Sequence, residues 1–244
     1  MIKINNLTKK YKDKLAVDNL NLEIKTGELF SLLGTNGAGK TTTIKMLSTL
    51  ILPTSGEVEI NNLDLVKDSS KIKEIINISP QETAVASNLT VLENLYFMAG
   101  IYQIPNKEDK IKELIKLFKL EEVLKQKAKT LSGGYQRKLS IAISLINDPK
   151  ILFLDEPTLG LDVISRHDLW KVIELLKGKT TIILTTHYME EAEKLSDRIG
   201  IMNKGKLIEL GTSKELIKKA KTKNFEDAFI KIIEEDNNEN TNIC

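Results

Sequence analysis

A glycine-rich segment that contains a lysine and a threonine carries the strongest chemical signal of the chain. It matches the pattern G-x-x-x-x-G-K-[ST] and consists of Gly34, Thr35, Asn36, Gly37, Ala38, Gly39, Lys40, Thr41 and, directly after the pattern, Thr42. Glycines allow the backbone to wrap around a phosphate chain and to point several N–H groups at it. Lys40 can then reach the β- and γ-phosphates, and the Thr41 hydroxyl can bind Mg²⁺. The segment therefore predicts a phosphate-binding loop.

The residues on either side of this segment support that interpretation. An apolar run over residues 29–33 precedes it, as a buried strand would, and Ile44, Leu47 and Ile51 follow it at helical spacing. A helix that starts there would add the positive end of its dipole beneath the phosphates. A glycine-rich turn that holds a lysine by chance would not need this context, so we favour the phosphate site.

Asp155 and Glu156 form an acidic pair directly after the apolar run 151–154. That position places both carboxylates at the carboxyl edge of a parallel sheet, where such folds bind ligands. We expect Asp155 to hold Mg²⁺, directly or through water, and Glu156 to orient or deprotonate the water that attacks the γ-phosphate. A pair of surface acids after a strand is the alternative, and the phosphate-binding loop makes it the weaker one.

A second candidate anion site lies in the segment Leu131-Ser132-Gly133-Gly134-Tyr135-Gln136. It opens an amphipathic stretch, so the serine and the two glycines would expose unpaired N–H groups at a helix N-terminus. An ordinary helix cap with flexible glycines is the alternative. The chain thus has two phosphate sites for a single acidic pair. A head-to-tail dimer explains the surplus, because the loop of one subunit and this segment of the other would enclose one nucleotide.

The hydrophobic pattern indicates the strands that position these residues. Apolar and polar side chains alternate, as in antiparallel strands with one exposed face, in the runs 2–7, 20–24 and 58–60. Nearly continuous apolar residues, typical of parallel strands covered on both faces, occupy the runs 29–33, 151–154 and 181–184. The turn signal Asn203-Lys204-Gly205-Lys206 predicts a hairpin between residues 199–202 and 207–210.

Helical periodicity replaces the strand pattern in the middle of the chain. Two apolar stripes appear, one of Ile111, Leu114, Ile115 and Phe118, and one of Leu139, Ala142, Ile143 and Ile146. We therefore predict an α/β fold: a P-loop NTPase core with a mostly parallel sheet and flanking helices, an antiparallel β subdomain, and an inserted α-helical subdomain at about 82–148. The ATPase domain would span 1–220. The tail 221–244, which is acidic and Asn-rich after Ile233, would be partly disordered.

Composition excludes several classes of protein. The 244 residues are 41% hydrophobic and carry a formal charge of +2. No apolar run approaches the ~20 residues needed to cross a bilayer, and the start of the chain lacks the layout of a signal peptide. We therefore expect a cytoplasmic chain that cannot move a substrate across a membrane by itself. The balanced charge gives no reason to expect nucleic acid as a partner.

Together these motifs resemble the ATP-binding cassette (ABC) ATPases, whose signature segment is usually LSGGQ and here has Tyr135 at its fifth position. The resemblance covers about residues 1–215 and implies an ATP-hydrolysing enzyme that uses ATP and Mg²⁺. It also implies further roles: Tyr11 stacks on adenine, Val17 lies beside it, Gln81 contacts Mg²⁺ and the attacking water, Asp162 communicates across the dimer, and His187 contacts the γ-phosphate. Each could be an ordinary packed or loop residue alone, and their order along the chain supports the assignment.

The resemblance implies the ATPase subunit of a transporter whose permease is a separate membrane protein, so the chain would lie at the inner face of the cell membrane. The cassette would pair with an identical chain or with a paralogue. Residues 41–47, 187–193 and 225–229 look like the subgroup that exports drugs, sodium ions and nodulation factors, although 225–229 could equally be an amphipathic helix that closes the core. An importer subunit, or a soluble ABC ATPase that acts on ribosomes or DNA, is the alternative.

Overall fold

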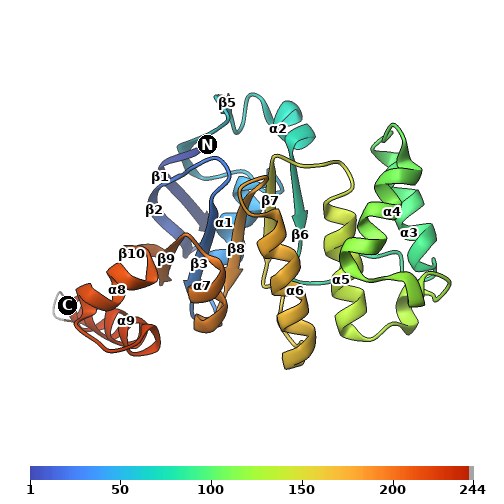
Figure 1. Ribbon diagram of the computed structural model, residues 1–244. Coiled ribbons are helices and arrows are strands. Elements are labelled where there is room, and N and C mark those ends of the chain that lie inside the picture. The colour runs from blue at the N-terminus through green and yellow to red at the C-terminus, as the bar shows by residue number, and fades with distance from the viewer. Residues whose placement is uncertain (242–244) are drawn as a thin grey trace.

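The centre of the molecule is a six-stranded sheet within residues 1–241, the part of the chain that the computed structural model describes (Figure 1). Its strands are β3 (Leu29–Gly34), β6 (Ile76–Ser79), β7 (Ile151–Asp155), β8 (Thr181–Thr186), β9 (Arg198–Asn203) and β10 (Lys206–Gly211). They lie in the order β10-β9-β3-β8-β7-β6, and neighbours are parallel except β10 and β9. Every residue of β3, β7 and β8 is buried, as in a sheet covered on both faces. The three predicted parallel strands and the predicted hairpin are confirmed.

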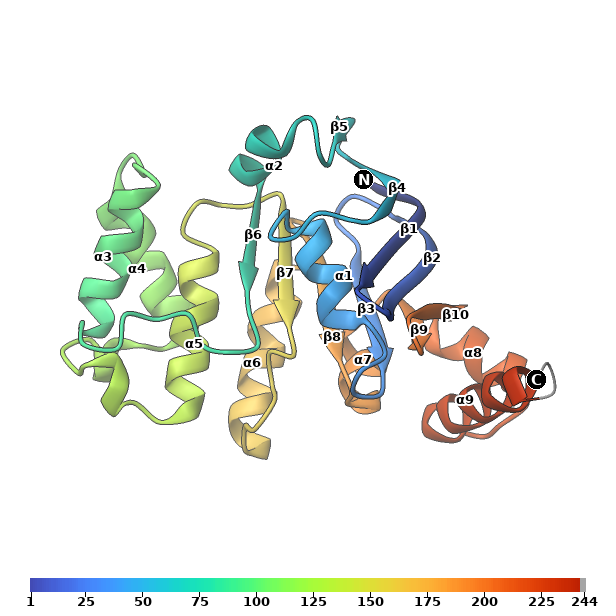
Figure 2. The same ribbon diagram turned by 180° about the vertical axis from the view of Figure 1, so that it is seen from behind.

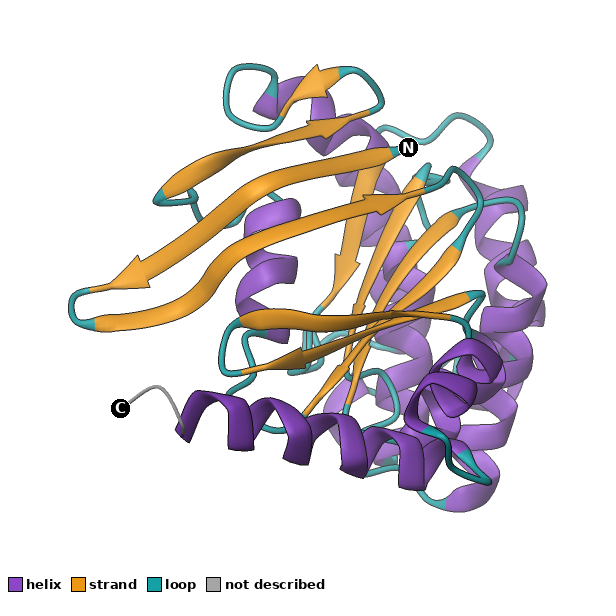
Figure 3. Cartoon of the chain, turned by 90° about the vertical axis from the view of Figure 1, so that its left-hand side faces the viewer, coloured by secondary structure: helices purple, strands orange, loops and turns teal. Residues whose placement is uncertain are grey.

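A second sheet is antiparallel and packs beside the first one (Figure 3). It contains β1 (Ile2–Tyr11), β2 (Lys14–Ile24), β4 (Ser55–Ile60) and β5 (Leu63–Asp64), in the order β2-β1-β4-β5. Apolar side chains of β1 and β2 share a core with α1 (Lys40–Leu47) and with one face of the central sheet, represented by Phe30 and Phe153. This packing confirms the predicted antiparallel subdomain and fixes α1 at the carboxyl end of β3.

Helices from the middle of the chain share a hydrophobic core with the other face of the central sheet. They are α3 (Val91–Ile101), α4 (Lys107–Phe118), α5 (Gly133–Ser144) and α6 (Val163–Leu176), with 3₁₀ turns at Glu121–Val123 and Ala128–Thr130, and the short α2 (Ser69–Ile75) precedes β6. Figure 2 shows α3, α4 and α5 grouped beyond β6 at one side of the sheet. The two predicted apolar stripes lie on α4 and along α5 and its C-terminal end, and all their residues are buried except the half-buried Ile115. Within residues 1–241, no helix is both long and apolar enough to cross a membrane.

The C-terminal part of the chain differs from the partly disordered tail that the sequence analysis expected. After α7 (Met189–Leu195) and α8 (Ser213–Ala220), residues Phe225–Thr241 form the 17-residue helix α9. Its apolar residues recur at helical spacing and are buried against α7, α8 and β9, which gives this region its own core. The amphipathic helix, expected as the alternative, is therefore present. The last part of the predicted tail, residues 242–244, lies outside the described residues.

Candidate active site

The phosphate-binding loop joins the end of β3 to the start of α1, and two of its glycines are required by close backbone approaches. At Gly39, whose φ is +103°, an added Cβ would lie 2.5 Å from the carbonyl oxygen of Ala16. At Gly34 it would lie 2.4 Å from the carbonyl oxygen of Met202. A side chain at either position would therefore displace the loop from the two hairpins that support it.

Lys40, the first residue of α1, points back into the loop. Its Nζ donates hydrogen bonds to the carbonyl oxygens of Gly34 (2.8 Å) and Thr35 (3.1 Å) and lies 3.6 Å from Glu156 Oε1. Burial lowers the pKa of Lys40, and the Glu156 carboxylate opposes that shift. The ammonium group is therefore held inside the loop and faces the acidic pair.

Asp155, at the end of β7, is buried and accepts two hydroxyl hydrogen bonds. Thr41 Oγ1 donates to Asp155 Oδ1 at 3.1 Å, and Thr185 Oγ1 donates to the same oxygen at 2.5 Å. The hydroxyl of the phosphate loop and the first carboxylate of the acidic pair are therefore neighbours. Hydroxyl and carboxylate oxygens are ligands that Mg²⁺ accepts beside nucleotide phosphates, so Thr41 and Asp155 fit a magnesium site.

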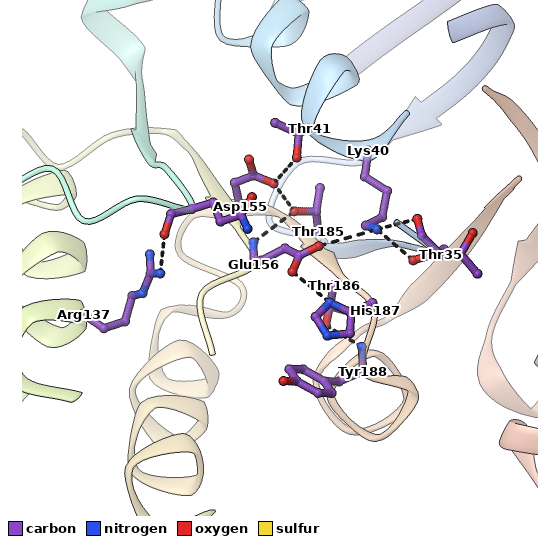
Figure 4. A network of polar contacts seen from close by, with 12 residues as sticks. Thr35, Lys40, Thr41, Arg137, Asp155, Glu156, Thr185, Thr186, His187 and Tyr188 are labelled. Atoms are coloured by element: carbon purple, nitrogen blue, oxygen red, sulfur yellow. Dashed lines mark hydrogen bonds and ion pairs between the residues drawn. The ribbon is translucent and has the colours of Figure 1, made fainter. Parts of the chain in front are cut away.

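Glu156 adopts a left-handed backbone conformation directly after β7, with a φ of 47°. This conformation is uncommon for a residue with a Cβ, and the Glu156 N–H is fixed by the carbonyl oxygen and Oγ1 of Thr185, both at 3.1 Å. The buried carboxylate contacts Lys40 through Oε1, and its Oε2 lies 2.8 Å from His187 Nδ1. Figure 4 shows the carboxylate between these two side chains. Backbone strain that aims a buried acid in this way is typical of functional residues.

These side chains meet at one cavity with a volume of 440 Å³. The loop from residue 36 to residue 42 lines it, together with Gln81, Glu156 and His187. Residues from five separate parts of the sequence are thus brought together at the carboxyl edge of the central sheet, where parallel sheets bind ligands. The cavity has the position expected for the triphosphate group of a nucleoside triphosphate.

The two residues expected near adenine lie outside this cavity. Val17 is fully buried in the core between the two sheets. Tyr11 is 46% exposed at the end of β1, where Lys9 Nζ lies 5.1 Å from its ring centroid. Lys14 and Ala16 line the cavity instead. Because side chains alternate along β2, Ala16 and Val17 point to opposite faces, and this geometry favours Ala16 as a nucleotide contact.

Arg137 belongs to the surroundings of the site and was missed by the sequence analysis. It lies on α5, is 5% exposed, and donates to the carbonyl oxygens of Pro80 (2.8 Å) and Gln81 (2.5 Å). Burial lowers the pKa of Arg137, and the charge of Asp155 opposes that shift. The guanidinium group therefore fixes the backbone of the loop that carries Gln81. The sequence feature that could have indicated this role is an arginine within a helix whose other residues are mostly buried.

The segment with Ser132, Gly133 and Gly134 lies at the N-terminus of α5. Ser132 is the N-cap, and Tyr135 N donates to its Oγ at 3.4 Å. Ser132 and Gly133 are exposed, Gly134 is half-buried, and none of the three lines the cavity. The predicted helix N-terminus is therefore present and faces solvent in this chain.

Asp162 caps the next helix, α6. Its Oδ1 accepts hydrogen bonds from the N–H groups of Ile164 and Ser165, both at 3.0 Å, and its Oδ2 accepts from Ser165 Oγ at 2.6 Å. The Ser165 bonds lower the pKa of Asp162. A Cβ at Gly134 would lie 2.9 Å from Ser165 Oγ, so the two helix starts touch. We call residues 132–134 and 162–165 together the signature face.

The fold and the cavity define a nucleotide-binding cassette, and comparison with known proteins identifies its family. The family model described as ABC transporter matches residues 17–159. The probable multidrug ABC transporter ATP-binding protein YbhF of Escherichia coli (strain K12) is 39% identical over 252 residues, which cover 99% of this chain and 43% of that protein. The linearmycin resistance ATP-binding protein LnrL of Bacillus subtilis (strain 168) is 41% identical over 219 residues, 88% of this chain and 70% of that protein. The chain thus spans less than half the length of the first of these relatives.

A solved structure shows the same architecture. It is the dimeric structure of a post-hydrolysis state of the ATP-binding cassette MJ0796 bound to ADP and Pi, with a TM-score of 0.79 and 30% identity over 87% of this chain and 98% of that one. The chain therefore belongs to the ABC transporter family and has the fold of its ATP-binding cassette. The predicted α/β fold with antiparallel and helical subdomains is confirmed.

Proposed function

We propose that the chain is the ATP-hydrolysing subunit of an ABC exporter. It binds ATP with Mg²⁺ between two cassettes in a head-to-tail dimer and drives a separate membrane permease. The observation that carries the proposal is the position of Glu156, whose carboxylate lies between Lys40 and His187 at the cavity lined by the phosphate loop. Family membership supports ATP as the ligand.

The phosphate loop, from Gly34 to Thr42, binds the triphosphate through backbone N–H groups and the N-terminus of α1. Lys40 exchanges its contacts with loop carbonyls for β- and γ-phosphate oxygens. Thr41 and Asp155 would hold Mg²⁺, and the side-chain amide of Gln81, which lines the cavity with Thr41, would supply a further oxygen. When bound, Mg²⁺ neutralises negative charge on the phosphates.

Hydrolysis requires a water molecule between Glu156 and the γ-phosphate. Glu156 orients this water or accepts its proton, while His187 holds the carboxylate through the 2.8 Å contact and would contact the γ-phosphate. Lys40 stabilises the charge that develops on the phosphate oxygens. The Thr185 bonds to the Glu156 N–H keep the acid aimed at the cavity before ATP arrives.

The signature face of a second cassette completes each site. Ser132, Gly133 and Gly134 of that cassette cover the phosphates, and its Asp162 communicates between the two sites. The separation of the signature face from the cavity within one chain supports this arrangement. The similar solved dimer supports it too. The second cassette is either an identical chain or a paralogue.

The test of the site is Glu156→Gln. Glutamine keeps the shape of the side chain and removes the proton acceptor, so ATP should bind and hold the dimer closed while turnover falls by at least about hundredfold. Phosphate release measures turnover, and light scattering after size-exclusion chromatography measures the dimer. Glu190→Gln, at an exposed acid near the site, is the matched control and should leave both unchanged. Normal hydrolysis in Glu156→Gln would contradict the assigned role.

Export of drug-like compounds is favoured because two similar proteins are named for multidrug transport and for linearmycin resistance. The permease would hold the chain at the cytoplasmic face of the cell membrane and would alone contact the cargo. Co-purification of a tagged chain from native membranes in mild detergent tests this role. A stoichiometric polytopic partner supports it, and a partner that requires a substrate-binding protein would indicate import. Recovery of ribosomal or DNA-associated proteins alone would overturn the transport role.

A further inference from the structure

Asn203 joins the C-terminal helix α9 to the end of β9. The residue is 6% exposed, and its Nδ2 donates to Asp236 Oδ2 at 2.7 Å and to Asn237 Oδ1 at 3.2 Å. Both acceptors belong to α9, which runs along the β9–β10 hairpin in Figure 3. A hydrogen bond from a buried amide to a carboxylate is charge-assisted and stronger than one between neutral groups. The C-terminal half of α9 is therefore hydrogen-bonded to the hairpin.

The turn of that hairpin lies directly against the phosphate-binding loop. Gly205 N donates to the carbonyl oxygen of Ala38 at 3.1 Å, and the Gly205 carbonyl accepts from Asp18 N at 2.8 Å. A Cβ at Gly39 would lie 3.4 Å from Gly205 Cα, so the two backbones are in contact there as well. The turn thus supports the loop at the point where it enters α1.

We propose that Asn203 is a positioning residue for ATP binding, held by α9 and acting through the β9–β10 turn on the phosphate-binding loop. The inference rests on the proposed function, because it assigns α9 a role at the same site. A glycine-rich loop has little stiffness of its own, so its shape depends on the backbone that supports it. When the bond between Asn203 and Asp236 is lost, the turn keeps its bond to Asp18 but loses the support from α9, and the loop presents its N–H groups to the phosphates less well.

If the bond between Asn203 and Asp236 served only to stabilise the fold, its loss would have a different effect. In that case Asn203 only docks α9 onto the hairpin, and its loss lowers the melting temperature without changing nucleotide affinity. The two roles are separable because affinity and stability are measured independently on the same variants.

The test exchanges the two partners of the bond. Asn203→Asp places a second carboxylate against Asp236 and should weaken ATP binding by about fivefold, the effect of one net hydrogen bond. Combining it with Asp236→Asn reverses donor and acceptor, restores the pair, and should return the affinity to within about twofold of wild type. Lys231→Ala is the matched control. Lys231 Nζ joins α9 to α8 through the carbonyl oxygen of Ala220 at 2.9 Å, so ATP binding should stay unchanged.

Binding of ATP with Mg²⁺ to the full chain is measured by isothermal titration calorimetry, and folding by thermal melting. Weaker binding in Asn203→Asp that the exchange rescues supports the inference. Unchanged affinity in Asn203→Asp overturns it, whatever the melting temperature, and so does a folded double variant that fails to regain affinity. A wild-type chain that binds no ATP would overturn the proposed function, and this inference with it.

Discussion

The cavity and the signature face both handle phosphate in our proposal, yet they are built differently. At the cavity, Lys40, Asp155 and Glu156 are buried and are held by carbonyls, threonine hydroxyls and His187. At the signature face, Ser132 and Asp162 are exposed and cap their own helices. The first region is therefore preorganised within one chain, whereas we propose that the second acts only when two cassettes meet.

Because of this difference, ATP binding and ATP turnover should depend on different residues. Binding of ATP to a single cassette should depend on the cavity, because its groups are already in place before a second cassette arrives. Turnover should depend on both regions, because the signature face enters only in the dimer. Variants can therefore be assigned to one region by comparing their effects on binding and on hydrolysis.

The largest effect is expected from Lys40→Ala in the cavity. The change removes the cation that faces the phosphates and leaves Glu156 without its buried partner. Turnover should fall by at least about hundredfold, and ATP binding should weaken as well. Phosphate release and calorimetric titration measure the two effects. Lys45→Ala, at an exposed lysine on the same helix, should behave as wild type, and equal losses in both variants would deny Lys40 a special role.

Ser132→Ala in the signature face should separate the two measurements. Binding of ATP to one cassette should be unchanged, while turnover falls by about tenfold because the second cassette lacks a phosphate contact. The change also removes a helix cap, so Thr90→Ala, which removes the cap of α3, controls for stability alone. If Ser132→Ala weakened binding to one cassette as strongly as it slowed turnover, the two regions would not be separable.

A mixture of Lys40→Ala and Ser132→Ala chains tests whether the cavity of one chain works with the signature face of the other. A Lys40→Ala chain carries an intact signature face, and a Ser132→Ala chain carries an intact phosphate loop. In a head-to-tail pair, one of the two composite sites would be complete. Mixed chains should therefore hydrolyse ATP faster than either variant alone, and no recovery would argue against the head-to-tail arrangement.

Arg137 connects the two regions, because α5 begins at the signature face and Arg137 holds the loop that carries Gln81. Arg137→Gln should slow turnover by about fivefold and destabilise the chain by about 1–3 kcal/mol, since two backbone carbonyls lose their donor. Steady-state kinetics and urea unfolding measure the two effects. Arg137→Lys, which keeps one donor and the charge, should lie between wild type and Arg137→Gln. A loss of stability without any change in kcat would reduce Arg137 to a packing residue.

Glu191 gives the smallest expected effect and tests how the cavity is supported. It lies on α7, is fully buried, and accepts a hydrogen bond from Trp170 Nε1 at 2.9 Å. Burial raises the pKa of Glu191, and the hydrogen bond from Trp170 opposes that shift. The folded chain therefore binds more protons than the unfolded chain between the ordinary value of 4.5 and the raised value. Stability should fall as pH rises through that window.

Glu191→Gln should remove this loss, because glutamine keeps the acceptor for Trp170 and carries no charge. The melting temperature at neutral pH should rise by about 2 °C, the effect of a fraction of a kcal/mol in a chain of this length. Thermal melting at several pH values measures the change, and Glu190→Gln is the exposed control. A variant whose stability depended on pH as strongly as wild type would exclude Glu191 as the titrating group.

Local patterns predicted the parts of this fold whose signals lie within a few residues. The phosphate loop, the acidic pair and the parallel strands were of this kind. Arg137 could not be assigned, because Gln81 is distant in sequence and only packing brings the two together. Val17 was expected beside the nucleotide, although the two-residue period of its strand turns it into the core and presents Ala16 instead. Its role and those of the other predicted site residues stay predictions until the variants are measured.

The C-terminal tail, residues 221–244, could not be assigned from its sequence alone for a different reason. Acidic and asparagine residues dominate the tail after Ile233, while the apolar positions that build α9 lie before that point. Their helical spacing was visible at Phe225, Ala228 and Phe229, but their burial depended on a surface made by α7, α8 and β9. Tertiary packing decided between the two alternatives, as it does for many marginal helices.

The supports of the phosphate loop have a consequence for the synthesis of the protein. Gly39 packs against Ala16 in the first hairpin of the chain, and Gly34 packs against Met202 in the last one. A ribosome makes these segments at widely separated times, and contacts between such distant segments form late. A nascent cassette should therefore be unable to bind ATP until β9 and β10 have left the exit tunnel, so that nucleotide occupancy marks a finished subunit.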